Sequence, residues 1–179
     1  MNIVLIGLRA SGKTTIGRLL AQRLERPFID LDDRALARFE QKSIRDVWIE
    51  RGENAWRRAE AAALQGILKN DGQIVALGGG TPMIVEVQRT LQASRDARSV
   101  RIVYLKCSIG ELQRRLTANP GDRPSLTAAG LTNEIASVLA QREPTYLGLA
   151  DAQYDTSNVS PEKAADDLKI AVENTEPAT

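Results

Sequence analysis

Histidine is absent from this chain of 179 residues. Its absence excludes serine–histidine triads, cysteine–histidine pairs and zinc sites that include histidine. Acid–base chemistry would fall to a carboxylate or a lysine, and a bound metal would take oxygen ligands, for which Mg²⁺ is the natural choice. Cysteine is nearly absent as well, because Cys107 stands alone and no disulfide can form within the chain. We expect a small buried thiol and a reducing, cytoplasmic location.

Long apolar runs and an excess of one charge are also missing. No stretch approaches the roughly 18 apolar residues that a membrane span needs, and a strand pattern begins at residue 2, so we expect no signal peptide. Lys and Arg number 24 against 23 Asp and Glu, which leaves a net charge of +1. Proteins that bind nucleic acid or anionic membranes are usually strongly basic. Neither kind of partner is therefore expected.

The most informative motif of the chain is Gly-Leu-Arg-Ala-Ser-Gly-Lys-Thr at residues 7–14, which fits G-x-x-x-x-G-K-[ST]. It follows an apolar strand pattern at Asn2–Ile6 and opens a helical pattern at Lys13–Glu25. Backbone N–H groups of such a loop and the helix N-terminus bind anions. Lys13 is expected to reach the β- and γ-phosphates of a nucleoside triphosphate, and the Thr14 hydroxyl to ligate Mg²⁺. The order of strand, loop and helix argues against a plain turn with a coincidental lysine.

Five short apolar runs with little alternation are typical of parallel strands that are covered on both faces. They are Asn2–Ile6, Pro27–Leu31, Gln73–Leu77, Arg101–Leu105 and Ala152–Thr156. Helical patterns separate them, so we predict a three-layer α/β fold in which helices flank a five-stranded parallel sheet with right-handed crossovers. A helical insert is expected at about 33–68. Residues 1–174 would form one domain, and 175–179 a frayed tail.

Helix boundaries are marked by capping residues and by one proline. Ser43, Ser108 and Ser160 stand where the N-caps of three helices are predicted. Arg142 comes directly before Glu143-Pro144, where we expect its helix to bend or end.

Unusual residues follow several of the predicted strands, at the edge where open α/β sheets bind ligands. Asp30 and Asp32 are two apart at the end of the second strand, so both would project to one face. A carboxylate there could orient an acceptor hydroxyl and take its proton. Gly78–Gly80 follow the third strand and permit close backbone approach to a ligand. A solvated acidic loop and an ordinary glycine turn remain the alternatives.

Arginines add candidate anion contacts in two places. Arg57 lies in a helical pattern at Glu53–Leu68, where helical spacing places it beside Glu60, although a surface salt bridge would explain this pair equally well. Arg123 lies in a stretch flanked by Pro and Gly, and we predict a mobile lid over residues of about 119–130 that supplies charge to the transferring phosphoryl group.

In their order and spacing these segments resemble the shikimate kinase family of nucleoside monophosphate kinase-like P-loop proteins. The resemblance runs from residue 2 to about 172 and rests on Gly7–Thr15, Phe28–Asp32, Ser43-Ile44, Gly52–Glu60, Leu77–Gly80, Arg123-Pro124 and Arg142–Tyr146. It implies transfer of the ATP γ-phosphate, with Mg²⁺, to the 3-hydroxyl of shikimate in aromatic amino acid biosynthesis. It also implies that shikimate is the small-molecule partner, and we expect a monomer.

The resemblance assigns roles residue by residue. Lys13, Asp32 and Arg123 would be catalytic, with Asp32 either a true base or only a group that orients the hydroxyl. Substrate contacts would come from Asp32, Arg57, Gly78, Gly79, Gly80 and Arg142, of which the two arginines would hold the carboxylate. Nucleotide contacts would come from Gly7, Ala10, Ser11, Gly12, Lys13, Thr14, Thr15, Arg115, Arg123 and Ser157. Metal contacts would come from Thr14 and Asp30.

Ala10 departs from the family pattern, in which this position of the loop is usually glycine. If the position needs a positive φ, alanine strains the loop by on the order of 1 kcal/mol; if it does not, the change is harmless.

Two alternatives to the shikimate kinase reading stay open. One is another small-molecule P-loop kinase, such as a gluconate kinase, which would share the phosphate loop and the sheet. The other is a non-catalytic module that binds shikimate and reports to a partner, since a fold alone does not determine function.

Overall fold

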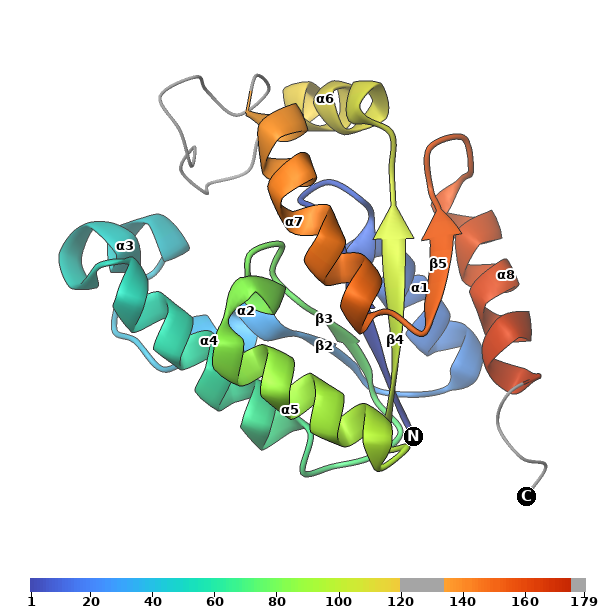
Figure 1. Cartoon of the computed structure of the whole chain (residues 1–179), viewed down its shortest axis with the longest axis horizontal. Helices are drawn as coiled ribbons and strands as arrows, with labels where there is room; N and C mark the ends of the chain where they lie inside the picture. The colour runs from blue at the N-terminus through green and yellow to red at the C-terminus, as the bar shows by residue number, and fades with distance from the viewer. Residues whose placement is uncertain (120–133, 175–179) are drawn as a thin grey trace.

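A parallel sheet of five strands in the order β2-β3-β1-β4-β5 forms the centre of the computed structural model, which describes residues 1–119 and 134–174 (Figure 1). The strands are β1 (Asn2–Ile6), β2 (Phe28–Asp30), β3 (Ile74–Ala76), β4 (Val100–Lys106) and β5 (Ala152–Asp155). All neighbouring strands pair in parallel, so the predicted five-stranded parallel sheet is confirmed. The observed strand ends differ from the predicted ends by one residue at most.

Helices cover both faces of this sheet, which confirms the three-layer α/β fold. Along β1, Ile3 and Leu5 pack in one core cluster, whereas Val4 and Ile6 pack in another, because successive strand side chains point to opposite faces. The first cluster lies under α1 (Lys13–Leu24) and α8 (Pro161–Glu173). The second cluster lies under α2 (Leu31–Leu36), α3 (Ile44–Arg51), α4 (Glu53–Ile67), α5 (Val85–Asp96) and α7 (Ile135–Leu149). Figure 1 shows α4, α5 and α7 on the near side of the sheet and α1 behind it.

The predicted helical insert between β2 and β3 consists of α2, α3 and α4. Ser43 begins α3 as predicted, since its hydroxyl oxygen accepts the Asp46 N–H at 3.1 Å. Trp56 and Leu64 of α4 are buried against the sheet. The insert is therefore anchored to the second core cluster.

We expected the helix that carries Arg142 to bend or end at Pro144, and the second of these expectations is wrong. α7 continues through this proline to Leu149. Proline cannot donate a backbone hydrogen bond, which normally destabilises a helix interior. Here Tyr146 and Leu149 are buried in the second core cluster, and their burial holds the last turns of α7 in place.

Two further elements complete the described part of the chain. The short 3-10 helix η1 (Thr81–Met83) follows β3, and α6 (Ile109–Ala118) follows β4. Apart from residue 119, the predicted lid and its Arg123 lie outside the described residues, as does the predicted tail at 175–179. Among the described residues, no helix is both long and apolar enough to cross a membrane.

Candidate active site

Two adjoining cavities open at the carboxyl ends of the strands. The larger is a cleft of about 840 Å³ above the phosphate loop, and Lys13 and Asp32 are among the residues that line it. The smaller is bordered by α3, α4, α7 and the segment after β3, and Arg57 lies in its wall. Arg9 borders both cavities. The phosphate loop therefore forms the floor of one cavity and the edge of the other.

Lys13 is folded back over the phosphate loop. Its Nζ donates to the carbonyl oxygens of Gly7 at 3.0 Å and Leu8 at 2.8 Å. Gly7 has φ of 144°, and a Cβ there would lie 2.6 Å from the Leu105 carbonyl oxygen, so only glycine fits. The loop thus holds its lysine at the cleft through two of its own carbonyl groups.

Asp30 joins the phosphate loop to the start of α2. The Thr14 hydroxyl donates to its Oδ2 at 2.9 Å, and its Oδ1 accepts the Asp32 N–H at 3.0 Å. Because this second bond caps a helix, β2 ends at Asp30, and Asp32 lies in the first turn of α2. Our expectation that both carboxylates project from one face of a strand is therefore wrong. Both nevertheless line the larger cleft.

The same residues fit a magnesium ion. Thr14 and Asp30 offer a hydroxyl and a carboxylate oxygen within 2.9 Å of one another at the mouth of the phosphate loop. Mg²⁺ prefers such hard oxygens and is usually held by one or two protein groups together with phosphate and water. In the part of the chain that the structure describes, no group of three or more Asp, Glu or Cys residues could enclose a metal without phosphate.

Ala10 adopts the left-handed conformation that the glycine of related loops suggested, with φ of 65°. The Arg115 guanidinium donates to the carbonyl oxygens of Ala10 at 3.2 Å and Thr156 at 2.6 Å. Arg115 thereby ties the phosphate loop to the segment after β5. It also lines the larger cleft, as expected of a nucleotide contact, and its guanidinium donates a further hydrogen bond to Glu111 at 2.7 Å.

The other predicted nucleotide contacts divide into two groups. Gly12, Thr15 and Ser157 line the larger cleft. The Ser157 hydroxyl also organises its own loop, because it accepts the Ser108 N–H at 2.9 Å and donates to Asp155. Gly7 and Ser11 are not among the residues that line the cleft, and the Ser11 side chain is buried beneath the loop.

Arg57 is held in the wall of the smaller cavity by two carboxylates. Its guanidinium donates to Glu60 at 2.9 Å and to Glu53 at 2.8 Å, and it lies 5.5 Å from the centre of the Trp48 ring. Glu60 is fully buried and also accepts the Thr81 hydroxyl. Burial raises the pKa of Glu60, while the Arg57 charge acts in the opposite direction. The predicted pairing of Arg57 with Glu60 is therefore correct, and it orients a partly buried guanidinium.

The three glycines after β3 bring the two cavities together. A Cβ at Gly78 would lie 2.8 Å from Asp32 Oδ1, and one at Gly80 would lie 2.7 Å from the Arg57 guanidinium. Gly79 borders both cavities. Side chains at these positions would displace the groups that face the cavities, which explains why the segment is all glycine.

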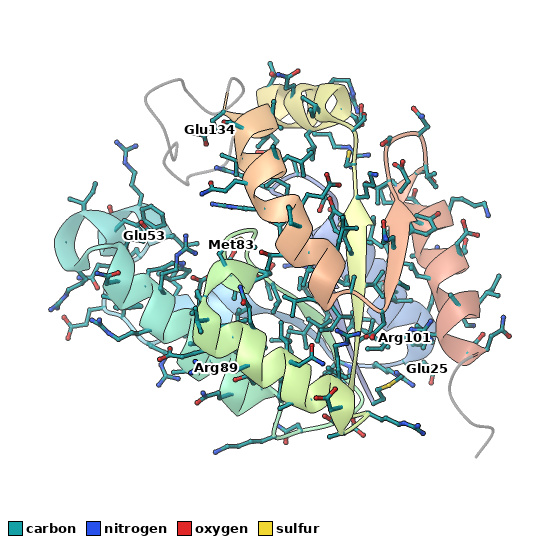
Figure 2. All side chains as sticks on the ribbon, in the orientation of Figure 1. Glu25, Glu53, Met83, Arg89, Arg101 and Glu134 are labelled. Carbon is teal, nitrogen blue, oxygen red and sulfur yellow. The ribbon has the colours of Figure 1, made fainter. Side chains whose placement is uncertain are left out.

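Sequence reasoning missed several residues of the smaller cavity. Trp48, Trp56 and Glu134 line it beside the predicted Arg142, and Arg9 borders it from the phosphate loop. Figure 2 labels Glu134 at the start of α7 and Glu53 at the start of α4. Arg9 occupies a variable position of its motif, and Glu134 follows a segment without periodicity, so neither carried a signal in the sequence.

The family model and the most similar curated relatives agree on one family. The sequence model of the family described as "Shikimate kinase" matches residues 9–173. A shikimate kinase from Bordetella pertussis is 38% identical over 157 residues, which cover 88% of this chain and 71% of that protein.

Solved structures agree with this match. A shikimate kinase from Bacteroides thetaiotaomicron superposes with a TM-score of 0.82 at 28% identity, covering 97% of this chain and 98% of the other. A shikimate kinase from Acinetobacter baumannii in complex with shikimate has a TM-score of 0.85 and covers 97% of this chain and 94% of its own. Its identity of 23% supports the fold alone.

Proposed function

Because the chain belongs to the shikimate kinase family, we propose that it transfers the γ-phosphate of ATP to the 3-hydroxyl of shikimate. The observation that carries the proposal is the meeting of a phosphate-binding cleft with an arginine-walled cavity along Arg9 and Gly79. A donor in the cleft and a carboxylic acid in the cavity would face one another across this border. Transfer between two bound molecules gains most of its rate from such positioning.

On the nucleotide side, the phosphate loop would hold the triphosphate. Lys13 would leave the loop carbonyls for the β- and γ-phosphates, and backbone N–H groups at the start of α1 would complete the cradle. Thr14 and Asp30 would hold Mg²⁺, which supplies charge neutralisation of the phosphates when bound. Arg115 would act at the cleft wall, and Arg123 would add positive charge to the transferring group.

On the acceptor side, Arg57 and Arg142 would bind the carboxylate, since a guanidinium matches the two oxygens of a carboxylate. Asp32, which lies beside Gly78, would accept the hydrogen bond of the 3-hydroxyl. As the new O–P bond forms and the bond to the ADP oxygen breaks, the hydroxyl proton would pass to Asp32. The products are shikimate 3-phosphate and ADP.

Residues 1–174 would form one kinase domain. The protein would act as a monomer, with shikimate and ATP as its small-molecule partners. A cytoplasmic location is supported by the dependence on ATP and by a single buried cysteine, Cys107, which is compatible with a reducing compartment.

A coupled assay of ADP release tests this function. The assay contains ATP and Mg²⁺ with shikimate, with gluconate or with no acceptor. Release that depends on shikimate is expected. Release with gluconate instead would overturn the assignment of Arg57 and Arg142, and no acceptor-dependent release would count against kinase activity and for a sensing role.

A further inference from the structure

Tyr146 is a buried polar residue that the phosphate loop and the predicted substrate contacts leave without a role. It lies in α7, its side chain is completely buried, and its hydroxyl donates a 2.5 Å hydrogen bond to the Gly79 carbonyl oxygen. Gly79 borders both cavities. A tyrosine of one helix therefore reaches the backbone segment that separates the two candidate binding sites.

The bond to Gly79 determines the direction of the next N–H group. The peptide between Gly79 and Gly80 is trans, and the C=O and N–H of a trans peptide point in opposite directions within one plane. With its carbonyl held towards Tyr146, this peptide points the Gly80 N–H away from that hydroxyl. Among the described residues this N–H finds no acceptor, and Gly80 lines the cavity that holds Arg57 and Arg142.

The segment needs an external anchor, because glycines offer no side chain to hold their own peptide groups. Its far end is held by the Thr81 hydroxyl, which donates to Glu60. Its middle is held by Tyr146. Burial raises the pKa of Tyr146 to about 12, although the charge of Arg142 and a hydrogen bond with its side chain oppose this, so the hydroxyl keeps its proton at physiological pH and remains a donor to Gly79.

We propose that Tyr146 is a positioning residue for the acceptor, whose hydroxyl orients the Gly79–Gly80 peptide so that the Gly80 N–H is presented to the substrate. The inference rests on the proposed function and deepens it. The Tyr146 hydroxyl would touch no substrate itself, but it would set the direction of the Gly80 N–H, which does. It also makes α7 contribute twice to the acceptor site, through Arg142 and, one turn later, through Tyr146.

The variant Tyr146→Phe removes the hydroxyl and keeps the ring. Tyr104→Phe is its matched control, because Tyr104 is also buried, its ring lies 5.2 Å from that of Tyr146, and its hydroxyl donates to Glu143 rather than to the glycine segment. Shikimate affinity is read from the fluorescence of the two tryptophans, Trp48 and Trp56, which both line the cavity.

Loss of a buried hydrogen bond should weaken shikimate binding in Tyr146→Phe, raising Kd and KM about five- to twentyfold. The kcat and the KM for ATP should stay within about twofold of wild type, and Tyr104→Phe should behave as wild type. An unchanged KM for shikimate in Tyr146→Phe would overturn the inference. So would an equal rise in both variants, which would indicate a general loss of packing.

The direction of the Gly80 N–H in the protein without ligand separates this inference from the proposed function. If the wild-type protein does not bind shikimate, the proposed function fails, but the positioning role is still tested without ligand. The residual dipolar coupling of the Gly80 N–H, which reports the direction of that bond, should change in Tyr146→Phe and stay as in wild type in Tyr104→Phe, and equal couplings in all three proteins overturn the inference. Should Tyr146→Phe not fold, a slowly exchanging Tyr146 hydroxyl proton close to Gly79 is expected in the NMR spectrum of the wild type, and its absence would contradict the proposal.

Discussion

Single residues at this site act through the groups that hold them. Arg57 illustrates this, since Glu53, Glu60 and the Trp48 ring together leave its guanidinium one orientation in the cavity wall. A surface salt bridge between the same residue types would contribute little. The difference lies in the complete burial of Glu60, which shields its contact with Arg57 from water.

Arg57→Lys should therefore raise the KM for shikimate about ten- to a hundredfold with little change in kcat, because lysine cannot make the forked contact with a carboxylate. Steady-state kinetics with varied shikimate measures this. Arg58→Lys is the matched control, since Arg58 is the next residue of α4 and is exposed. A lower kcat with an unchanged KM in Arg57→Lys would contradict the carboxylate role.

Ala10 is a second residue whose surroundings decide its effect. At φ of 65° an alanine costs on the order of 1 kcal/mol, which the Arg115 contact with its carbonyl helps to offset. Ala10→Gly should raise the free energy of unfolding by about 0.5 kcal/mol, because relief of strain exceeds the extra flexibility that glycine gives the unfolded chain.

The control for Ala10→Gly is the same substitution in a regular helix. Ala62 lies inside α4, where Ala62→Gly should lower the free energy of unfolding by about 1 kcal/mol. Chemical denaturation measures both. If the two variants are destabilised equally, the strain at Ala10 is absent.

At the scale of elements, periodicity and motif order predicted the sheet and its helical layers, because apolar strands and a phosphate loop are local in sequence. The ends of elements were harder to predict. The pattern at Pro27–Leu31 extends β2 past Asp30, but the capping bond from Asp32 ends the strand there. At Pro144, where we expected a bend or an end, the end did not occur for a related reason, since burial of Tyr146 outweighs a local helix-breaking signal.

The candidate site also divides into residues that a local sequence pattern predicts and residues that matter only through packing. The cavity positions of motif residues such as Lys13 and Arg57 could be predicted, because each stands in a recognisable local pattern of the sequence. The roles of Arg9 and Tyr146 could not, although both stand in segments that carry the family resemblance, because their contacts form only when the phosphate loop, the glycine segment and α7 come together in three dimensions.

The N-cap of α3 provides a prediction for an element. Ser43→Ala removes the hydrogen bond to Asp46 and should lower the free energy of unfolding by about 1 kcal/mol. Because α3 carries Trp48 into the acceptor cavity, the KM for shikimate should rise as well. Ser43→Asn retains a capping oxygen and should remain close to wild type in denaturation. Equal stability of all three proteins would contradict the capping role.

For the whole molecule, the arrangement of layers places two adjoining cavities on one edge of the sheet. The sheet and α1 support the phosphate loop, while the insert and α7 enclose the smaller cavity. The glycine segment after β3 is shared by both. This division explains how one chain could hold a charged nucleotide and a small acid in contact while each is bound by different elements.

The most direct test of the account is the structure of the product. The protein is incubated with ATP, Mg²⁺ and shikimate, and the mixture is analysed by ³¹P and ¹H NMR. The account predicts a phosphate ester on the 3-hydroxyl of shikimate and an equal amount of ADP, with no ester in a sample from which Mg²⁺ has been chelated. An ester at another hydroxyl would contradict the placement of Asp32, and ATP that remains intact beside unmodified shikimate would contradict the central claim.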